Sequence, residues 1–287
     1  IQMHPGDAPL ESLAAAMAQQ FFPNDDASVA AARRERFGFE LRRSSFGMSD
    51  TLQEIDDLGN TSIVLVVDQF EELFRYARRQ AEGDPEAQRH EEATQFVQVL
   101  LAASRDRALN VYVLLTMRSD FIGDCANFHS LPEAVSASQF LVPSLTRNQR
   151  EEAIRLPIEN AGATIEPELV ERLLNDSGDD VDQLPVLQHC VLRVWEAAGL
   201  SAAATGSHAR CLTARNYEDV GGIAHALSKH ADEILECLRG AELAVQQVFR
   251  SLAEIDLEGR IVRRALPYND LLAETGVTAD QLRTVVD

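Results

Sequence analysis

Two continuous runs of apolar residues dominate the hydrophobic pattern in the first half of the chain. Residues 62–67 form a β-branched run that ends at Asp68, and residues 110–117 form a second run that ends at Arg118. Because strands covered on both faces of a parallel sheet show no polar alternation, both runs predict central strands of such a sheet. A helical stretch over 86–105 separates them, and this order is the βαβ unit of an α/β fold.

Helical periodicity is predicted on either side of this unit. One helix is expected over 10–21, after the helix-start residues Asp7-Ala8-Pro9, and another over 28–43. A short strand is expected over 139–143. The helix over 28–43 is rich in arginine, and two interpretations of it stay open: a solvated basic face relieved by neighbouring acids, or a docking patch for an acidic partner.

The pattern changes near residues 144–146, where we place a domain boundary. Helical segments dominate from Arg147 onward, and the strand-like run in that part covers 259–264. We therefore expect an α/β core over 1–145, a helical domain over 146–215, and over 216–287 a third domain that reads helix, short β, helix.

Composition narrows the class of protein. Hydrophobic residues make up 45% and charged residues 25% of the 287 residues, which is typical of globular chains. The formal net charge of -20 repels phosphates, so nucleic acid and anionic membranes are disfavoured as broad partners. No apolar run reaches the roughly 18 residues of a membrane span, and the first residues do not resemble a signal peptide. Four cysteines without metal or disulfide spacing fit a reduced, cytoplasmic compartment.

Three carboxylates follow the first buried strand. Asp68 ends the strand, and Glu71 and Glu72 come within four residues of it. Ligands bind at the carboxyl ends of strands in open α/β sheets, and one oriented aspartate there can hold Mg²⁺ through its water shell. A neighbouring glutamate can position an attacking water. The structural alternative is that Asp68 caps a turn while the two glutamates sit at an exposed helix start, where they suit the helix dipole.

Arg118 ends the second strand and is expected beside the same crevice. A guanidinium there can stabilise phosphate charge. Taken alone, Arg118 could equally pair with Asp120 or Asp124, so its role depends on its neighbours at the strand ends.

These residues resemble the STAND class of P-loop ATPases, most closely the bacterial novel STAND NTPase type 1 domain. The run Val66-Val67-Asp68-Gln69-Phe70-Glu71-Glu72-Leu73-Phe74 is similar to its Walker B motif. Further similar segments occur in order along nearly the whole chain: 5–10 after the family's second strand, 116–121 at its sensor strand, 184–189 with Trp195 in its helical domain, and 217–227 and 259–264 towards its winged helix.

The resemblance implies site roles and cofactors. The nucleotide is ATP or ADP with Mg²⁺: Asp68 holds the metal through water, Glu72 (or Glu71) acts on the attacking water, and Arg118 contacts the γ-phosphate. Pro185 lies near the adenine base, although Gln183 stands where related helical domains often place glycine. The three domains become a nucleotide-binding core, a helical lid and the beginning of a winged helix.

One departure concerns the phosphate-binding loop. The loop needs Gly-x-x-x-x-Gly-Lys-Ser/Thr, and the single lysine, Lys229, lies between Ser228 and His230. We interpret the chain as the part that follows this loop. The strand leading into the loop is then expected between the strands that end at Asp68 and Arg118, so direct pairing of these two strands would contradict that interpretation.

The implied function is a signalling switch. Nucleotide exchange alters the lid, and self-association then activates an effector, with effector and sensor domains outside this chain. Two alternatives stay open: a scaffold that assembles without hydrolysis, and a DNA-acting ATPase whose winged helix reads duplex. The net charge of -20 disfavours the second.

Overall fold

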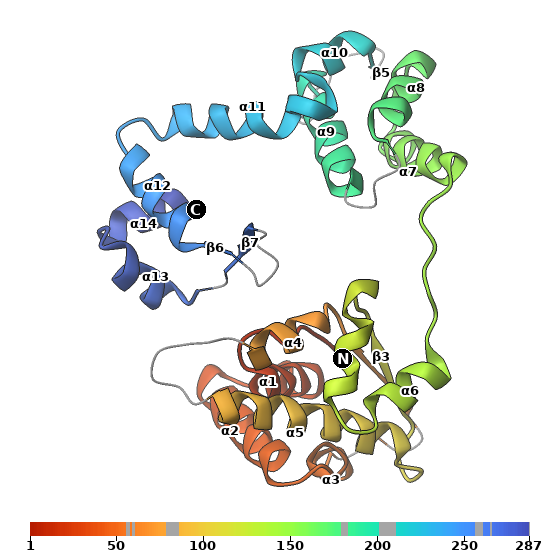
Figure 1. The fold of residues 1–287 in the computed structure, drawn as a ribbon, viewed down its shortest axis with the longest axis vertical. Coiled ribbons are helices and arrows are strands. Elements are labelled where there is room, and N and C mark those ends of the chain that lie inside the picture. Colours follow the sequence, from red (N-terminus) through yellow and green to blue (C-terminus); the bar gives the residue numbers. More distant parts are fainter. Residues whose placement is uncertain are drawn as a thin grey trace. The chain divides into compact units, whose positions relative to one another are not determined.

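The computed structural model describes residues 1–55, 58, 61–78, 86–178, 183–200, 211–255, 261–264 and 266–286 (Figure 1). The chain divides into two compact units, Ile1–Val142 and Pro143–Asp287. It is a helix-rich α/β structure with a small parallel sheet in unit 1. None of the helices in the described ranges is both long and apolar enough to pass through a bilayer.

Unit 1 contains the three-stranded sheet and its helices. Its elements in chain order are β1 (Gln2–Met3), α1 (Pro9–Phe21), α2 (Ala27–Arg43), α3 (Gly47–Gln53), β2 (Ile63–Val67), α4 (Glu71–Arg78), α5 (Glu86–Arg105), β3 (Val111–Leu115), the 3-10 segment η1 (Ser119–Asn127) and α6 (Leu131–Ser138).

The sheet has the order β1-β2-β3, with all strands parallel. β2 pairs directly with β3 along its whole length, from Ile63 opposite Val111 to Val67 opposite Leu115. The prediction that these strands lie in one parallel sheet is confirmed, and the prediction that another strand separates them is wrong. Consecutive strands joined by a helical crossover commonly become neighbours, and here α5 is that crossover. This pairing contradicts the interpretation that the chain is the part that follows a phosphate-binding loop whose strand lies between β2 and β3.

Only one face of the sheet is covered in the described part of unit 1. Ile63, Leu65 and Val67 point into the core, where α1 packs on β1 and α5 packs on β3. On the other face, Val64 is 48% exposed and Leu114 is 54% exposed. The continuous apolar runs predicted strands covered on both faces, so this part of the prediction is wrong. An apolar run shows that both faces of a strand can be buried, but the described helices cover only one face of this sheet.

The strand predicted over 139–143 is not formed. Phe140, Leu141 and Val142 are 83%, 72% and 78% exposed, and no described strand pairs with them. A strand requires a partner for its backbone hydrogen bonds, and composition alone does not provide one.

The arginines of α2 are largely paired within unit 1. Arg33 bonds Asp25 at 2.7 Å, and Arg42 bonds Glu11 at 2.8 Å. Arg36 pairs with Glu54, and Arg43 with Glu40. These contacts favour the solvated basic face over a docking patch for an acidic partner.

Unit 2 is built from short helices with two small sheets. Its elements are α7 (Arg147–Asn160), β4 (Thr164–Ile165), α8 (Pro167–Asp176), α9 (Gln183–Ala197), β5 (Cys211–Leu212), α10 (Ala214–Asp219), α11 (Gly222–Cys237), α12 (Glu242–Ser251), β6 (Ala253–Ile255), β7 (Ile261–Arg263), α13 (Tyr268–Thr275) and α14 (Ala279–Val286). One apolar cluster joins α7 to α11, and a separate one joins α12, α13 and α14.

A buried tyrosine organises the turn between α10 and α11. The Tyr217 hydroxyl donates to Asp176 Oδ2 at 2.6 Å and accepts from the Ile223 amide at 3.1 Å. Burial and the bond to Asp176 raise the pKa of Tyr217 to about 12. Gly222, with φ of +65°, lies against the ring, where an added Cβ would come within 3.1 Å of it. The motif over 217–227 thus has a structural explanation.

Replacing Tyr217 with phenylalanine should destabilise unit 2. The change leaves the Ile223 amide and the Asp176 carboxylate without this partner, which typically costs about 1–3 kcal/mol. Urea unfolding measures the loss. Tyr112→Phe is the matched control, because this hydroxyl is on an exposed side chain and its removal should change stability by less than about 0.5 kcal/mol. Equal effects of the two changes would contradict the role of the Tyr217 network.

Candidate functional site

The carboxyl ends of β2 and β3 bring a polar pair together. Val67 lies opposite Leu115, so the next residues, Asp68 and Thr116, are neighbours. The Thr116 hydroxyl donates to Asp68 Oδ1, and the Gln69 amide donates to the same oxygen at 3.1 Å. These contacts hold the carboxylate at the carboxyl ends of the strands, which is where open α/β sheets commonly bind ligands.

The backbone around Asp68 is tied to both neighbouring strands. The Asp68 amide donates to Met3 O at 2.9 Å, and the Phe70 amide donates to Thr116 O at 2.8 Å. Between them, Gln69 has φ of +54°, a left-handed conformation that is uncommon for a residue with a side chain. Strained conformations of this kind persist only where the surroundings enforce them, and they cluster at functional sites.

Asp68 fits an outer-sphere magnesium site. The carboxylate is half-buried, and its Oδ2 makes no hydrogen bond within the described residues. An open carboxylate oxygen can accept from a metal-bound water, and Mg²⁺ commonly uses one or two carboxylates together with substrate phosphates. No group of three or more His, Cys, Asp or Glu residues suited to a metal is found in the parts of the chain that the structure covers.

The two glutamates begin α4 but have different surroundings. Glu71 is 7% exposed, and its Oε2 has no hydrogen-bond partner among the described residues. Glu72 is half-buried, and its Oε2 accepts the amide of Gly6 at 3.1 Å. The structure therefore places both glutamates within four residues of Asp68 and gives the Glu72 carboxylate a defined structural contact.

Arg118 follows β3 and pairs with Asp120. Its Nε donates to Asp120 Oδ1 at 3.1 Å, and its side chain is 53% exposed. Asp124, the other acid considered as its partner, pairs with Arg78. Arg118 lies two residues beyond Thr116, so its backbone is close to the strand ends at which Asp68 lies.

Pro185 lies in the first turn of α9, in unit 2, and is exposed. The predicted contact of Pro185 with an adenine base stays a prediction.

The residue patterns assigned no site role to Thr116, Gln69 or Gly6. Thr116 could have been found from its position, because it is the first polar residue after the second apolar run, as Asp68 is after the first. The left-handed Gln69 and the amide contact of Gly6 leave no such signal in the residue types.

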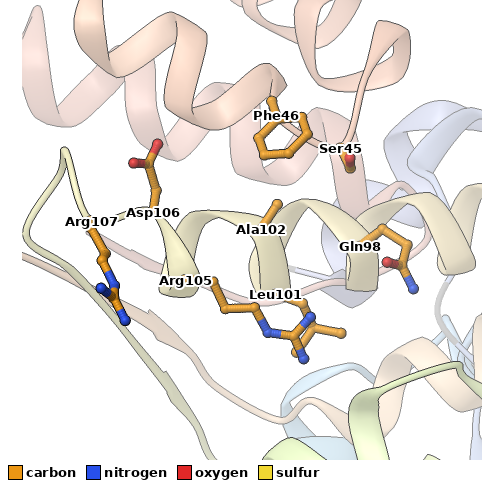
Figure 2. Close-up of a pocket in the computed structure, with 8 residues that line it drawn as sticks. All are labelled: Ser45, Phe46, Gln98, Leu101, Ala102, Arg105, Asp106 and Arg107. Atoms are coloured by element: carbon orange, nitrogen blue, oxygen red, sulfur yellow. The ribbon is translucent and has the colours of Figure 1, made fainter.

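A separate pocket lies at the opposite end of β3. Its volume is about 440 Å³, and Figure 2 shows its lining on α5, on the loop that leads into β3, and just ahead of α3. Arg105 and Arg107 line it together with Phe46 and Asp106. This pocket contains none of the predicted site residues, because it is at the amino end of β3 whereas Asp68 and Arg118 follow the carboxyl ends of their strands.

The model of the family described as Novel STAND NTPase 1 matches residues 1–287. No curated protein matches the chain.

Thr116→Val should loosen the Asp68 site and destabilise unit 1 by about 1 kcal/mol, since it removes the hydroxyl that bonds Asp68 and the Gln69 amide. Thr116→Ser keeps the hydroxyl and should recover most of the loss. Urea unfolding of both variants provides the comparison. Wild-type stability in Thr116→Val together with a loss in Thr116→Ser would assign the contribution to the methyl group and not to the hydrogen bonds.

Proposed function

Because the chain belongs to the Novel STAND NTPase 1 family, we propose that it is the ATPase core of a nucleotide-controlled signalling switch. The observation that carries the proposal is the Asp68 carboxylate at the end of β2, oriented by Thr116 and with Oδ2 open. Asp68 is the group that holds the water shell of Mg²⁺. When bound, Mg²⁺ neutralises charge on the β- and γ-phosphates of ATP.

The other site residues orient the attacking water and contact the phosphate and the base. Glu72, with Glu71 as its neighbour, orients the attacking water. Arg118 supplies positive charge to the γ-phosphate. This role requires Arg118 to leave Asp120, and an exposed ion pair of this kind contributes little to stability. Pro185 contacts the adenine base from the helical domain.

The domains carry the switch. We assign the nucleotide-binding core to 1–145, the lid to 146–215 and the beginning of a winged helix to 216–287. Exchange of ADP for ATP alters the lid, and self-association in the bacterial cytoplasm follows, with effector and sensor domains supplied outside these residues. Phosphate contacts of this kind govern domain rearrangement in other nucleotide switches.

A phosphate-binding loop is required and is not in the printed sequence. The direct pairing of β2 with β3 leaves no place between them for the strand of such a loop, so the proposed ATPase needs phosphate contacts from another source.

A second candidate is a scaffold that assembles without hydrolysis. It is favoured by the contacts of Glu72 with Gly6 and of Arg118 with Asp120, since both give candidate catalytic groups a structural partner. The mutations below separate it from the ATPase.

Asp68→Asn should weaken the Mg²⁺-dependent part of nucleotide binding. The amide removes the negative charge that holds the metal waters, while its oxygen can still accept from Thr116. A supporting group of a metal site typically contributes 10–100-fold in affinity, so a loss of about tenfold or more is expected. Calorimetry on the complete protein that contains this chain, with and without Mg²⁺, measures it. An unchanged Mg²⁺ dependence would remove Asp68 from the metal site.

Glu72→Gln should leave nucleotide affinity nearly unchanged and slow ATP turnover on the order of 10²-fold or more, because it removes a water-orienting carboxylate. The amide oxygen of glutamine can still accept the Gly6 amide, so the fold around it is retained. Glu71→Gln is the matched control for its neighbour.

ATP turnover and nucleotide affinity are measured for the wild type, Glu72→Gln and Glu71→Gln, each in the complete protein. Wild-type turnover in both glutamate variants would favour the scaffold. A large loss in Glu71→Gln alone would transfer the catalytic role to Glu71.

A further inference from the structure

The backbone amide of Gly6, in the turn between β1 and α1, contacts the start of α4. It donates to Glu72 Oε2 at 3.1 Å in a partly buried position, although the two residues are 66 positions apart in sequence. Among the described residues, no other hydrogen bond of the Glu72 carboxylate is found. The contact therefore sets the direction in which this carboxylate points.

The turn that presents the amide is itself fixed in place. Gly6 has φ of +59°, a conformation that side chains rarely adopt. The Ser12 hydroxyl donates to Pro5 O at 3.1 Å, and the Ser12 amide donates to Ala8 O at 2.8 Å, so the turn is held by the first turn of α1. On its other side, Met3 O accepts the amide of Asp68. A fixed donor of this kind holds the carboxylate toward β1 and α1.

The same carboxylate has a second task in the proposed reaction. To orient water for attack on a γ-phosphate, it must face the phosphate, and a hydrogen bond to the β1–α1 turn competes with that orientation. Glu71 does not compete for the Gly6 amide, because its buried Oε2 has no hydrogen-bond partner among the described residues.

We propose that the Gly6–Glu72 hydrogen bond is a latch that holds Glu72 away from the reaction and couples nucleotide occupancy to the β1–α1 turn. The latch rests on the proposed ATPase function. Binding of ATP draws the carboxylate to the nucleotide and releases the Gly6 amide. By linkage, loosening the turn favours the nucleotide-facing arrangement by the same factor.

Gly6→Ala tests the latch without changing either glutamate. Alanine at φ of +59° is strained, so the turn shifts and the hydrogen bond weakens, while the added Cβ meets only Ser12 Oγ at an ordinary 4.0 Å. Untriggered ATP turnover in the complete protein should rise about threefold to tenfold, the range expected for losing one hydrogen bond. Gly6→Ala combined with Glu72→Gln should lose this gain.

Gly276→Ala is the matched control, because Gly276 has a similar φ of +65° with nothing within 4 Å of an added Cβ and lies in unit 2. Turnover in this variant should stay at the wild-type rate. A Gly6→Ala rate equal to or below that of Gly276→Ala would overturn the latch.

A spectroscopic readout covers the case in which Gly6→Ala does not fold. In protein labelled with ¹⁵N-glycine, Glu72→Ala should move the amide resonance of Gly6, and Glu71→Ala should not. A non-hydrolysable ATP analogue with Mg²⁺ should move the wild-type resonance in the same direction as Glu72→Ala. A resonance that stays fixed while calorimetry shows the analogue bound would overturn the latch alone. Absence of both binding and turnover would overturn the ATPase proposal and the latch with it.

Discussion

The direct parallel pairing of β2 with β3 is the constraint on which the rest of unit 1 depends. It brings Val67 opposite Leu115, and because both strands continue in register, Asp68 and Thr116 meet at their ends. The Phe70 amide then bonds Thr116 O, which turns the chain so that α4 can begin at Glu71. The positions of both glutamates therefore follow from a backbone pairing more than forty residues apart in sequence, and not from their own helix.

The two central strands and the crossover helix were predictable because their signals are strong. A β-branched apolar run bounded by polar residues is difficult to place elsewhere than in a sheet, and the helix expected over 86–105 is α5 at Glu86–Arg105. The order of the strands, the uncovered face and the absence of a strand at Phe140–Val142 were not predictable in this way. Each depends on which other element is present to pair or pack, and an apolar run carries no information about its partner.

The candidate site, like the fold, was predictable from the sequence only in part. Residue types at strand ends indicated Asp68 and Arg118, and the structure supplies the local partner of Arg118, Asp120, which the sequence had left as one of two choices. The contacts that set orientation come from backbone atoms. The Gly6 amide and the left-handed turn at Gln69 depend on where the backbone lies in space, and a residue type alone does not determine that.

The open edge of β3 also bears on how such a chain behaves at high concentration. Among the described residues no strand pairs with the outer edge of β3, and the exposed side chains of Tyr112 and Leu114 flank it, so a strand from another molecule can add there. A net charge of -20 opposes that encounter through mutual repulsion, which salt screens within about 8 Å at physiological ionic strength. Colloidal stability of the isolated chain is therefore set by charge, and moderate salt, which often keeps proteins dispersed, is expected to promote its aggregation.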